Sequence, residues 1–579
     1  MSSKQQKGKS SLAFHGFRGV DVRACQTDPP SAQRLLNFRI RPDGSLEKRS
    51  GYRPLLDLGA PIRALWTGKV GGRFRGYLIL GNLLYSLSFS TLKKEVIGEL
   101  DTSDGKACIF FYRGDLYVLD FTGFYQWKDG ALVRPVGYVP LIGRDWSQGE
   151  IGLPYEPKNI LSPHARISYL ITDPPTIFLC ADGRIASVEA LYINGILQSA
   201  DKYTLDTDFN TVNVPGLSVG DRVVVHLTFN VDYSALLSEL YSSLEVTLFG
   251  DANCDRLFFW GGDPGNTVFC TSFVSAAQLK ESRRHYPDSG TLYFPEGFEF
   301  KIGSGQTKIT GAIRHYDRLL LMTDSETWMV SGGASGLEAL PAVCVNPQLG
   351  CEHSRAVVLA GNDPVSIGQG GIWRWTGDTR ELNHQNALCI SREIEGELPP
   401  GELSYGCLYY HRADDTLWVL LPEKEEAWIL SPNHGGWSCF SNIRADFLLD
   451  LDGKVGFLHD NVIYVFESDC TTDRSKDGTE SEILGIYESN LLDFGTNRKK
   501  KLSEISLYGD LGDGEVIFNF SGEGIAPFTH TFTEENHATH SMLRTRAYSG
   551  RFLFGTVTLT APGGAKQIVH SLSIGLRES

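Results

Sequence analysis

The sequence Asp415-Thr416-Leu417-Trp418-Val419-Leu420 places one turn residue in front of a run of apolar and aromatic residues. An Asp, Asn or Gly at such a position supplies the positive φ that a tight hairpin needs, and the run behind it suits a strand buried on both faces. Six further copies of this pattern begin at Gly81, Gly114, Asp255, Asp317, Gly370 and Asp460. The chain is therefore expected to consist of short hairpins.

The spacing of these copies predicts a β-propeller. From the fourth copy onward they follow one another at roughly 45 to 60 residues, which is the length of a four-stranded blade. Seven copies with one irregular gap predict about six blades plus inserted material. A β-sandwich or a string of small β domains is the alternative that the pattern leaves open.

Composition also favours an all-β fold class. The chain has 579 residues, which is too many for one ordinary core, and it contains 62 Gly, 31 Phe and 23 Tyr beside four Met. Flat aromatic rings suit pleated sheets, and this balance favours strands and turns over helices. Helical periodicity is confined to two short stretches, at 234–243 and 275–284.

The domain boundaries follow from interruptions of the repeated pattern. In the gap between the second and third copies, Asn194-Gly195 gives a hairpin signal of its own, which predicts a small inserted β-sandwich. A polar stretch at 467–482 is expected to end the propeller as a linker. The predicted units are an N-terminal arm with the first blades at 1–159, the inserted β-sandwich at 160–230, the remaining blades at 231–470 and a C-terminal β-sandwich at 483–579.

The net charge and the cysteine content limit which binding partners and which cellular compartment suit this chain. The net charge of -15 argues against a surface that grips nucleic acid, but it permits a passage through which DNA slides. The 11 cysteines form no C-x-x-C pair and are expected to be buried thiols, among them Cys25, Cys108, Cys180, Cys254, Cys270 and Cys344. No apolar run suits a signal peptide or a membrane span, so we expect synthesis in the cytoplasm and no membrane insertion.

Motifs for catalysis are absent along the sequence. The stretch Gly333-Ala334-Ser335-Gly336 has the wrong spacing for a serine nucleophile elbow. Gly8-Lys9-Ser10 lacks both the first glycine and the preceding strand of a phosphate-binding loop. The sequence therefore predicts no catalytic residue, no cofactor and no enzyme activity.

Four weaker signals have a structural interpretation that we favour. His530, His537 and His540 with Glu534 and Glu535 offer metal ligands, but strand spacing does not bring them together. Asp450-Leu451-Asp452-Gly453 begins like a calcium loop without its final carboxylate, so a hairpin is expected. The basic run Arg498 to Lys501 is expected to be a solvated turn. Core packing is favoured over sugar stacking for Trp373, Trp375, Trp418 and Trp428.

Several short stretches, spread over the chain, carry a family resemblance. The first is Phe17-Arg18-Gly19-Val20-Asp21, followed by Asp43-Gly44-Ser45-Leu46-Glu47-Lys48-Arg49-Ser50-Gly51-Tyr52. Tyr293 to Glu296 and Tyr316 to Leu319 follow, and then Leu491 to Gly495 with Lys499 to Lys501. Together they resemble bacteriophage tail proteins of the nozzle, or tail tubular, type, which are β-propeller virion proteins.

This resemblance implies a structural virion protein of a phage tail. Such a subunit would form a homo-oligomeric ring, such as a hexamer, that retains genomic DNA and conducts it during ejection. It would contact the portal or adaptor, other tail proteins and tail fibres. The alternative function is a receptor-binding propeller of the tail that binds or processes glycans.

Overall fold

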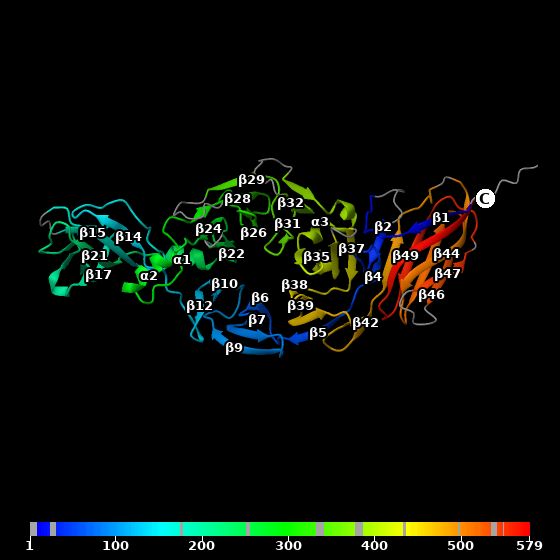
Figure 1. Ribbon diagram of the computed structural model, residues 1–579, viewed down its shortest axis with the longest axis horizontal. Coiled ribbons are helices and arrows are strands. Elements are labelled where there is room, and N and C mark those ends of the chain that lie inside the picture. The colour runs from blue at the N-terminus through cyan, green and yellow to red at the C-terminus, as the bar shows by residue number, and fades with distance from the viewer. Residues whose placement is uncertain are drawn as a thin grey trace, which may run out of the picture.

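The computed structural model describes residues 9–23, 31–173, 178–250, 255–331, 341–376, 386–431, 436–495, 498–533, 541–547 and 549–578. Strands make up most of these residues, and the all-β class predicted from the sequence is confirmed. The molecule is elongated, with a propeller in the middle and one further β module at each end (Figure 1).

Seven four-stranded units form the propeller in the described part of the chain. The first strands of neighbouring blades lie side by side, in the closed order β6, β10, β22, β26, β30, β34, β38 and back to β6. The first blade contains β6 (Ile62–Val70), β7 (Arg73–Leu80), β8 (Leu83–Ser88) and β9 (Lys93–Glu99). The second contains β10 (Cys108–Tyr112), β11 (Asp115–Leu119), β12 (Phe124–Lys128) and β13 (Ala131–Val133). The third contains β22 (Glu245–Phe249), β23 (Arg256–Trp260), β24 (Thr267–Cys270) and β25 (Phe300–Lys301). The next two are β26 (Gly311–His315), β27 (Arg318–Met322), β28 (Thr327–Ser331) and β29 (Ala342–Asn346); β30 (Val357–Ala360), β31 (Asp363–Gly368), β32 (Gly371–Trp375) and β33 (Ala387–Cys389).

The last two blades connect the propeller to the ends of the chain. They consist of β34 (Cys407–His411), β35 (Thr416–Leu421), β36 (Glu426–Ser431) and β37 (Gly436–Ser441), and of β38 (Phe447–Asp450), β39 (Val455–His459), β40 (Val462–Phe466) and β5 (Tyr52–Asp57). Because β5 comes from the N-terminal part and pairs with β40, it closes the ring of blades. The sequence estimate of about six blades is one short, since each of the seven copies of the pattern falls in a different blade.

Helices are few and short. The two helices expected from periodicity are confirmed as α1 (Ser234–Tyr241) and α2 (Ala276–His285). A capping box starts α2, in which the Ser275 side chain accepts from the Gln278 backbone and the Gln278 side chain accepts from the Ser275 backbone. The remaining helical turns are η1 (Ala200–Lys202), η2 (Arg392–Glu397), α3 (Pro400–Leu403) and η3 (Pro422–Lys424).

The inserted module lies at the end of the molecule opposite the C-terminal module (Figure 1). One sheet has the order β14 (Leu141–Trp146), β15 (His164–Leu170), β21 (Arg222–Phe229), β17 (Ile185–Ile193) and β18 (Ile196–Leu197). The other has the order β16 (Phe178–Cys180), β20 (Thr211–Asn213) and β19 (Thr204–Asp206). The module begins before residue 160, because β14 pairs in parallel with β15 and places Ile142 and Trp146 in its core.

A fragment that spans 138–231 is expected to fold alone, because the core of the inserted module is drawn entirely from within it. The shorter fragment 160–230 lacks β14, so it loses Ile142 and Trp146 and leaves the β15 edge unpaired. We expect cooperative thermal unfolding of the longer fragment and aggregation of the shorter one. Circular dichroism and size-exclusion chromatography would measure both, and equal behaviour of the two would contradict the boundary at β14.

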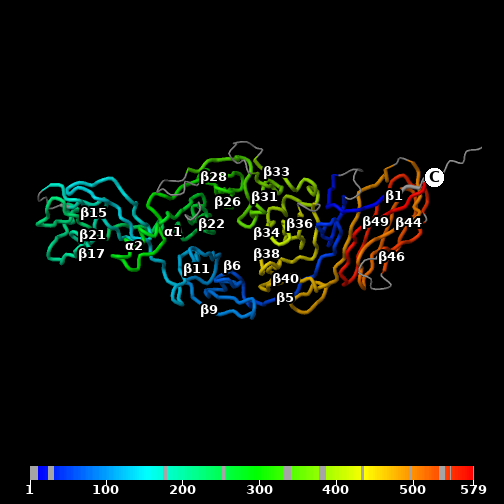
Figure 2. Tube along the Cα trace, viewed as in Figure 1, coloured from blue at the N-terminus to red at the C-terminus, as the bar shows by residue number. Residues whose placement is uncertain are grey.

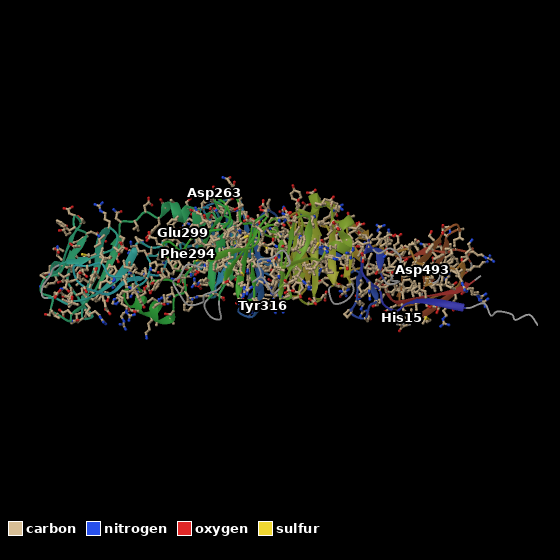
Figure 3. All side chains as sticks on the ribbon, turned by 90° about the horizontal axis from the view of Figure 1, so that it is seen from above. His15, Asp263, Phe294, Glu299, Tyr316 and Asp493 are labelled. Atoms are coloured by element: carbon tan, nitrogen blue, oxygen red, sulfur yellow. The ribbon has the colours of Figure 1, made fainter. Side chains whose placement is uncertain are left out.

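The C-terminal module is a β-sandwich to which both ends of the chain contribute (Figure 2). One sheet has the order β3 (Phe38–Ile40), β4 (Leu46–Lys48), β49 (Ile568–Glu578), β44 (Lys500–Asp510) and β47 (Ser541–Arg546), and β1 (Lys9–Phe14) also pairs with β49. The other contains β2 (Ala32–Leu36), β43 (Gly485–Ser489), β48 (Gly555–Ala561), β45 (Glu515–Gly522) and β46 (Phe528–Thr533). His15 and Asp493 lie at the same end of the molecule (Figure 3).

Two further predicted boundaries change. The described strands between Lys9 and Lys48 belong to the C-terminal sandwich instead of an arm on the first blades, because β1 and β4 pair with β49 and β2 pairs with β43. The stretch at 467–482 is a hairpin instead of a plain linker, with β41 (Thr472–Arg474) paired to β42 (Glu480–Glu482). These pairings join distant parts of the chain and leave no local pattern in the sequence.

One sheet runs without a break from the propeller into the sandwich. Its order is β34-β35-β36-β37-β2-β43-β48-β45-β46, so the sixth blade continues directly into the C-terminal module. The connection is the parallel pairing of β37 and β2 at Leu36 and Cys439. The two modules are therefore joined through the backbone at this point.

Candidate functional site

The motifs weighed in the sequence lie apart from one another. His530 lies on β46 opposite Phe518, whereas His537, His540, Glu534 and Glu535 lie outside the described residues, as do Gly8 and 333–336. Asp450 to Gly453 forms the turn between β38 and β39, where an Asp450 carboxylate oxygen accepts from the Gly453 backbone at 2.7 Å. The hairpin interpretation of this turn is confirmed.

The tryptophans and cysteines mostly belong to the core. Trp375, Trp418 and Trp428 are buried, as predicted, while Trp373 is half-buried and donates to the Gly368 carbonyl. Among the predicted buried thiols, Cys108 and Cys270 are buried, Cys180 and Cys344 are partly exposed, and Cys25 and Cys254 lie outside the described residues.

The basic run is a solvated turn only in its first half, because Arg498 and Lys499 are exposed ahead of β44, whereas Lys500 and Lys501 belong to that strand. Lys500 is fully buried at the start of β44, where its ammonium donates to the Asp493 carbonyl and lies over the Phe494 ring at 5.6 Å. Strand alternation turns Lys500 inward and Lys501 outward. One residue of this run of like charges, Lys500, is therefore buried, and its contacts anchor the first strand residue of β44.

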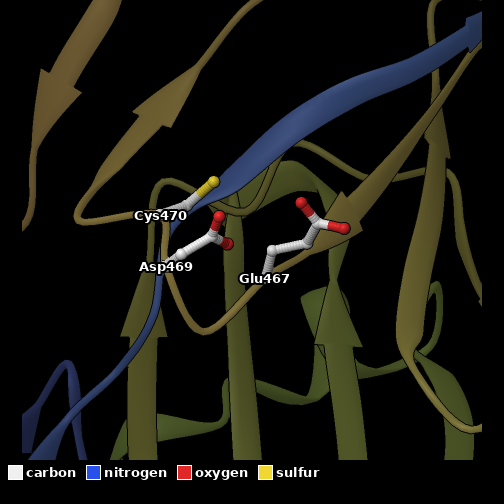
Figure 4. A group of neighbouring side chains, drawn as sticks. All are labelled: Glu467, Asp469 and Cys470. Carbon is white, nitrogen blue, oxygen red and sulfur yellow. The ribbon is translucent and has the colours of Figure 1, made fainter.

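Glu467, Asp469 and Cys470 bring three possible metal ligands within 4.8 Å of one another (Figure 4). Glu467, however, already accepts from Arg53 at 2.6 Å and from Lys454 at 3.0 Å. Asp469 is exposed on the loop after β40. With the Glu467 carboxylate paired to two cations, this group has the character of an ordinary surface ion-pair cluster.

The joint between propeller and sandwich is built around a buried arginine. The Arg49 guanidinium donates to both carboxylate oxygens of Asp473, at 2.8 and 2.6 Å, and the side chains of this pair are each 2% exposed. Arg49 also donates to the Asn37 side chain at 2.9 Å and to the Ser441 carbonyl at 2.9 Å. A bidentate pair of this kind, with its remaining donors satisfied, holds the sandwich, the sixth blade and the β41 hairpin in one geometry.

The two residues before Arg49 add further charges to this joint. Glu47 accepts from Arg39 at 2.6 Å and from Lys566 at 2.9 Å. Burial would raise the pKa of Glu47, but the two cations offset this effect and hold its pKa below the usual value. Lys48 donates to the carbonyls of Pro562 and Gly563, and burial lowers its pKa to about 8.

A cavity of about 620 Å³, here called the junction cavity, opens beside this joint. Its walls come from the sixth blade, the seventh blade, the β3–β4 hairpin and the loop before β49. Sequence reasoning missed it, because its lining residues lie in segments around 40, 415, 430, 455, 470 and 565. Polar residues from Ser45 to Arg49 are buried beside this cavity, and no local pattern in the sequence indicates their burial.

A second cavity, of about 380 Å³, lies at the centre of the propeller between the first strands of the blades. Lys106 and Glu245 form an ion pair of 2.8 Å there. Burial, with Glu245 beside it, raises the pKa of the Cys108 thiol, so this cysteine is a poor nucleophile at neutral pH. The volume suits a small molecule and does not admit a nucleic acid duplex.

Comparisons with known proteins add structural likeness alone. No protein-family model matches the chain, and no curated protein matches it. An exo-β-1,3-galactanase from Phanerochaete chrysosporium is 9% identical over 91% of this chain and 99% of its own, with a TM-score of 0.23. A streptogramin B lyase is 11% identical over 72% and 97%, with a TM-score of 0.26. PorZ of Porphyromonas gingivalis is 11% identical over 84% and 58%, with a TM-score of 0.27.

Glycoside hydrolases are among these matched structures, and this finding overturns the expectation that the chain is not an enzyme. The physical reason is that a propeller can bring carboxylates from separate blades together without leaving a motif along the chain. TM-scores this low carry no argument about a substrate or a reaction. Within the described residues, no helix has the length and apolar character needed to cross a membrane.

Proposed function

We propose that this chain is a structural subunit of a bacteriophage tail, of the nozzle type, which acts as part of a ring that holds and conducts DNA. The observation that carries the proposal is the continuous nine-stranded sheet, which joins the propeller to the sandwich through backbone hydrogen bonds. A subunit that must withstand the pressure of packaged DNA needs such a stiff connection more than it needs a hinge.

One of the stretches that carry the family resemblance, Asp43 to Tyr52, supports the same proposal, because it helps to build this joint. The Asp43 carboxylate accepts from Ser45, and Leu46 is fully buried. A side chain at Gly51 would collide with the Thr472 carbonyl, since an added Cβ would lie 2.0 Å from that oxygen. The Tyr52 hydroxyl donates to the Asn442 carbonyl at 2.9 Å. The stretch from Asp43 to Tyr52 thus has a structural task at nearly every position.

In this proposal the DNA passage lies between subunits. The propeller's own central cavity is too small for a duplex, so the channel requires a closed ring of copies related by head-to-tail contacts. A net charge of -15 on each subunit keeps phosphates from binding tightly as they pass. Portal or adaptor proteins and tail fibres would contact the ring, and the place of the protein would be the virion tail.

The proposal predicts a ring in particles and weak binding to DNA. Electron microscopy of virions with this subunit labelled should show a closed ring in the tail. Fluorescence anisotropy of a duplex at about 150 mM salt should give a dissociation constant no tighter than that of non-specific binding, about 10⁻⁴ to 10⁻⁶ M. Absence of the subunit from particles would contradict the ring, and nanomolar binding would contradict the sliding passage.

A glycan-binding propeller of the tail is the second candidate, and the junction cavity is the observation that favours it. Its lining combines aromatic side chains with polar and charged groups, a mixture that small-molecule sites share. A glycan array with the purified protein, together with a hydrolysis assay on cell-surface polysaccharides, tests it. Specific binding or cleavage would support this candidate, and a blank result in both assays would remove it.

A further inference from the structure

The junction cavity has the size and position of a ligand site. Its volume of about 620 Å³ falls within the range of about 300 to 1,000 Å³ that small-molecule sites occupy. It lies where the propeller, the sandwich and the β41 hairpin meet, and ligand sites favour such boundaries between modules. Neither the proposed ring nor its contacts account for an open space at this joint.

Part of the lining of the junction cavity is an aromatic cluster. Trp418 and Phe440 line it with ring centroids 5.5 Å apart, and Phe466 lies 5.6 Å from Trp418. The Trp418 indole N–H already donates to the Thr416 hydroxyl at 3.1 Å. Trp418 and Phe440 meet edge to face and are 7% and 5% exposed, so only the parts of these rings that reach the cavity offer apolar surface to a ligand.

The lining of the cavity also carries an excess of positive charge. Six cationic side chains line the cavity against three carboxylates: Arg39, Arg41, Lys48, Arg49, Lys454 and Lys566 against Glu47, Asp414 and Asp415. Part of this charge is balanced by Asp473 and Glu467, which lie outside the lining and pair with Arg49 and Lys454. Glu47, by contrast, is shared between two cations, and Lys48 donates to backbone carbonyls. This local excess of positive charge contrasts with the net charge of -15 that the whole chain carries.

We propose that the junction cavity binds a small anion with a ring-shaped body, whose acidic group lies among Lys48, Lys454 and Arg41 and whose ring packs against the parts of Trp418 and Phe440 that reach the cavity. The chemistry is that of a carboxylate or phosphate carried on a ring, as in an acidic sugar or a sugar phosphate. A ligand held there contacts both modules, so it also stabilises the joint by mass action.

Lys48 gives this site a dependence on pH. Burial lowers the pKa of Lys48 to about 8, with Glu482 opposing this effect and Arg49 adding to it, and a bound anion beside the ammonium raises that pKa again. Binding of an anion is therefore coupled to uptake of a proton, and affinity should fall as the pH rises above about 8. A merely apolar pocket would not show this dependence.

The test uses 8-anilinonaphthalene-1-sulfonate, a fluorescent aromatic anion, as the probe on the full-length protein. We expect saturable binding at one site, and weak binding of the uncharged N-phenyl-1-naphthylamine. Lys48→Met and Lys454→Met should each weaken the probe about tenfold, because each removes a charge-assisted contact. Lys202→Met, on the inserted module, is the matched control and should leave the affinity unchanged. Lys454 is exposed, so its variant keeps the test valid if Lys48→Met fails to fold.

Displacement of the probe identifies the source of the anion. Glucuronate should displace it and glucose should not if the ligand is an acidic sugar, and glucose 6-phosphate should do so if the ligand is a sugar phosphate. Loss of probe affinity between pH 7 and pH 9, absent in Lys48→Met, would support the assigned place of the acidic group. The proposal is overturned if neither cation variant weakens the probe, or if none of these anions displaces it at millimolar concentration.

Discussion

Replacement of Arg49 by methionine is expected to destabilise the joint between propeller and sandwich by about 3 to 5 kcal/mol. After the substitution the Asp473 carboxylate is still buried. Among the described residues, the side-chain donor that then remains to it is the Asn442 amide, at 3.0 Å. An isolated carboxylate in such a place must keep its charge at high cost or take up a proton. The Ser441 carbonyl and the Asn37 amide oxygen also each lose a hydrogen bond.

Hydrogen exchange with mass spectrometry measures this effect where it arises, in peptides that cover 37–52 and 470–475. The matched control is Arg134→Met, which breaks the exposed ion pair with Asp101 and should cost less than about 1 kcal/mol. The double variant Arg49→Met with Asp473→Leu removes both charges, so it should recover much of the loss. Equal protection of the joint in the wild type and in Arg49→Met would contradict the role assigned to this pair.

The sequence predicts the blades well because their signal is local. A turn residue and the strand behind it lie within about seven residues, and the partner strand lies just across the hairpin. The copy beginning at Asp415 shows this, since Thr416 pairs with His411 across the turn and Leu420 pairs with Cys407. Patterns of this range predicted the fold class, the two helices and the existence of an inserted module.

The joint is not predictable in this way, because its partners are far apart along the chain. Arg49 and Asp473 are separated by 424 positions, and β5 closes a blade whose other strands begin near residue 447. A charged residue in a polar stretch also indicates exposure by default. The stretch from Glu47 to Arg49 and the residue Lys500 are exceptions, in which tertiary pairing outweighs that default. The junction cavity, which depends on the same long-range contacts, was invisible for the same reason.

Acid is expected to loosen the contact between the inserted module and helix α2. His226 lies on β21, is 2% exposed, and has the rings of Tyr192, His285 and Tyr286 within 5.2 Å of its own. Burial lowers its pKa to about 3, with His285 and Arg166 adding to the effect and Glu189 opposing it. His285 itself has a lowered pKa, again chiefly through burial.

The other charged groups around His226 do not reverse this tendency. From β17, Glu189 accepts from Thr228 and Tyr286 and lies 2.7 Å from His164 of β15, so its charge is already engaged. From α2, Glu281 lies 3.8 Å from Arg166 and is more than half exposed. Protonation would therefore place a new cation beside Arg166 in a site that offers it no free carboxylate among these neighbours.

The direction of this pH dependence follows from the lowered pKa of His226. The closed contact binds fewer protons than the open one, so its stability is complete above about pH 6.5 and is lost as the pH falls toward 3. For His226 alone the loss at pH 5 is about 2 kcal/mol relative to pH 7. We expect faster hydrogen exchange of peptides from α2 and β21 at pH 5, after correction for the intrinsic rate, and no such change in the seventh blade.

His226→Phe isolates the cause, because phenylalanine keeps the ring among its aromatic neighbours and cannot take up a proton. The His226 Nε2 atom has no hydrogen-bond partner in the described structure, so the substitution gives up little there. The variant should be as well protected as the wild type at pH 7 and better protected at pH 5. His530→Phe, in the sandwich at the other end of the molecule, is the control and should keep the wild-type pH dependence at α2. If exchange at α2 and β21 rises equally at pH 5 in the wild type and in His226→Phe, the titration of His226 is not what loosens this contact.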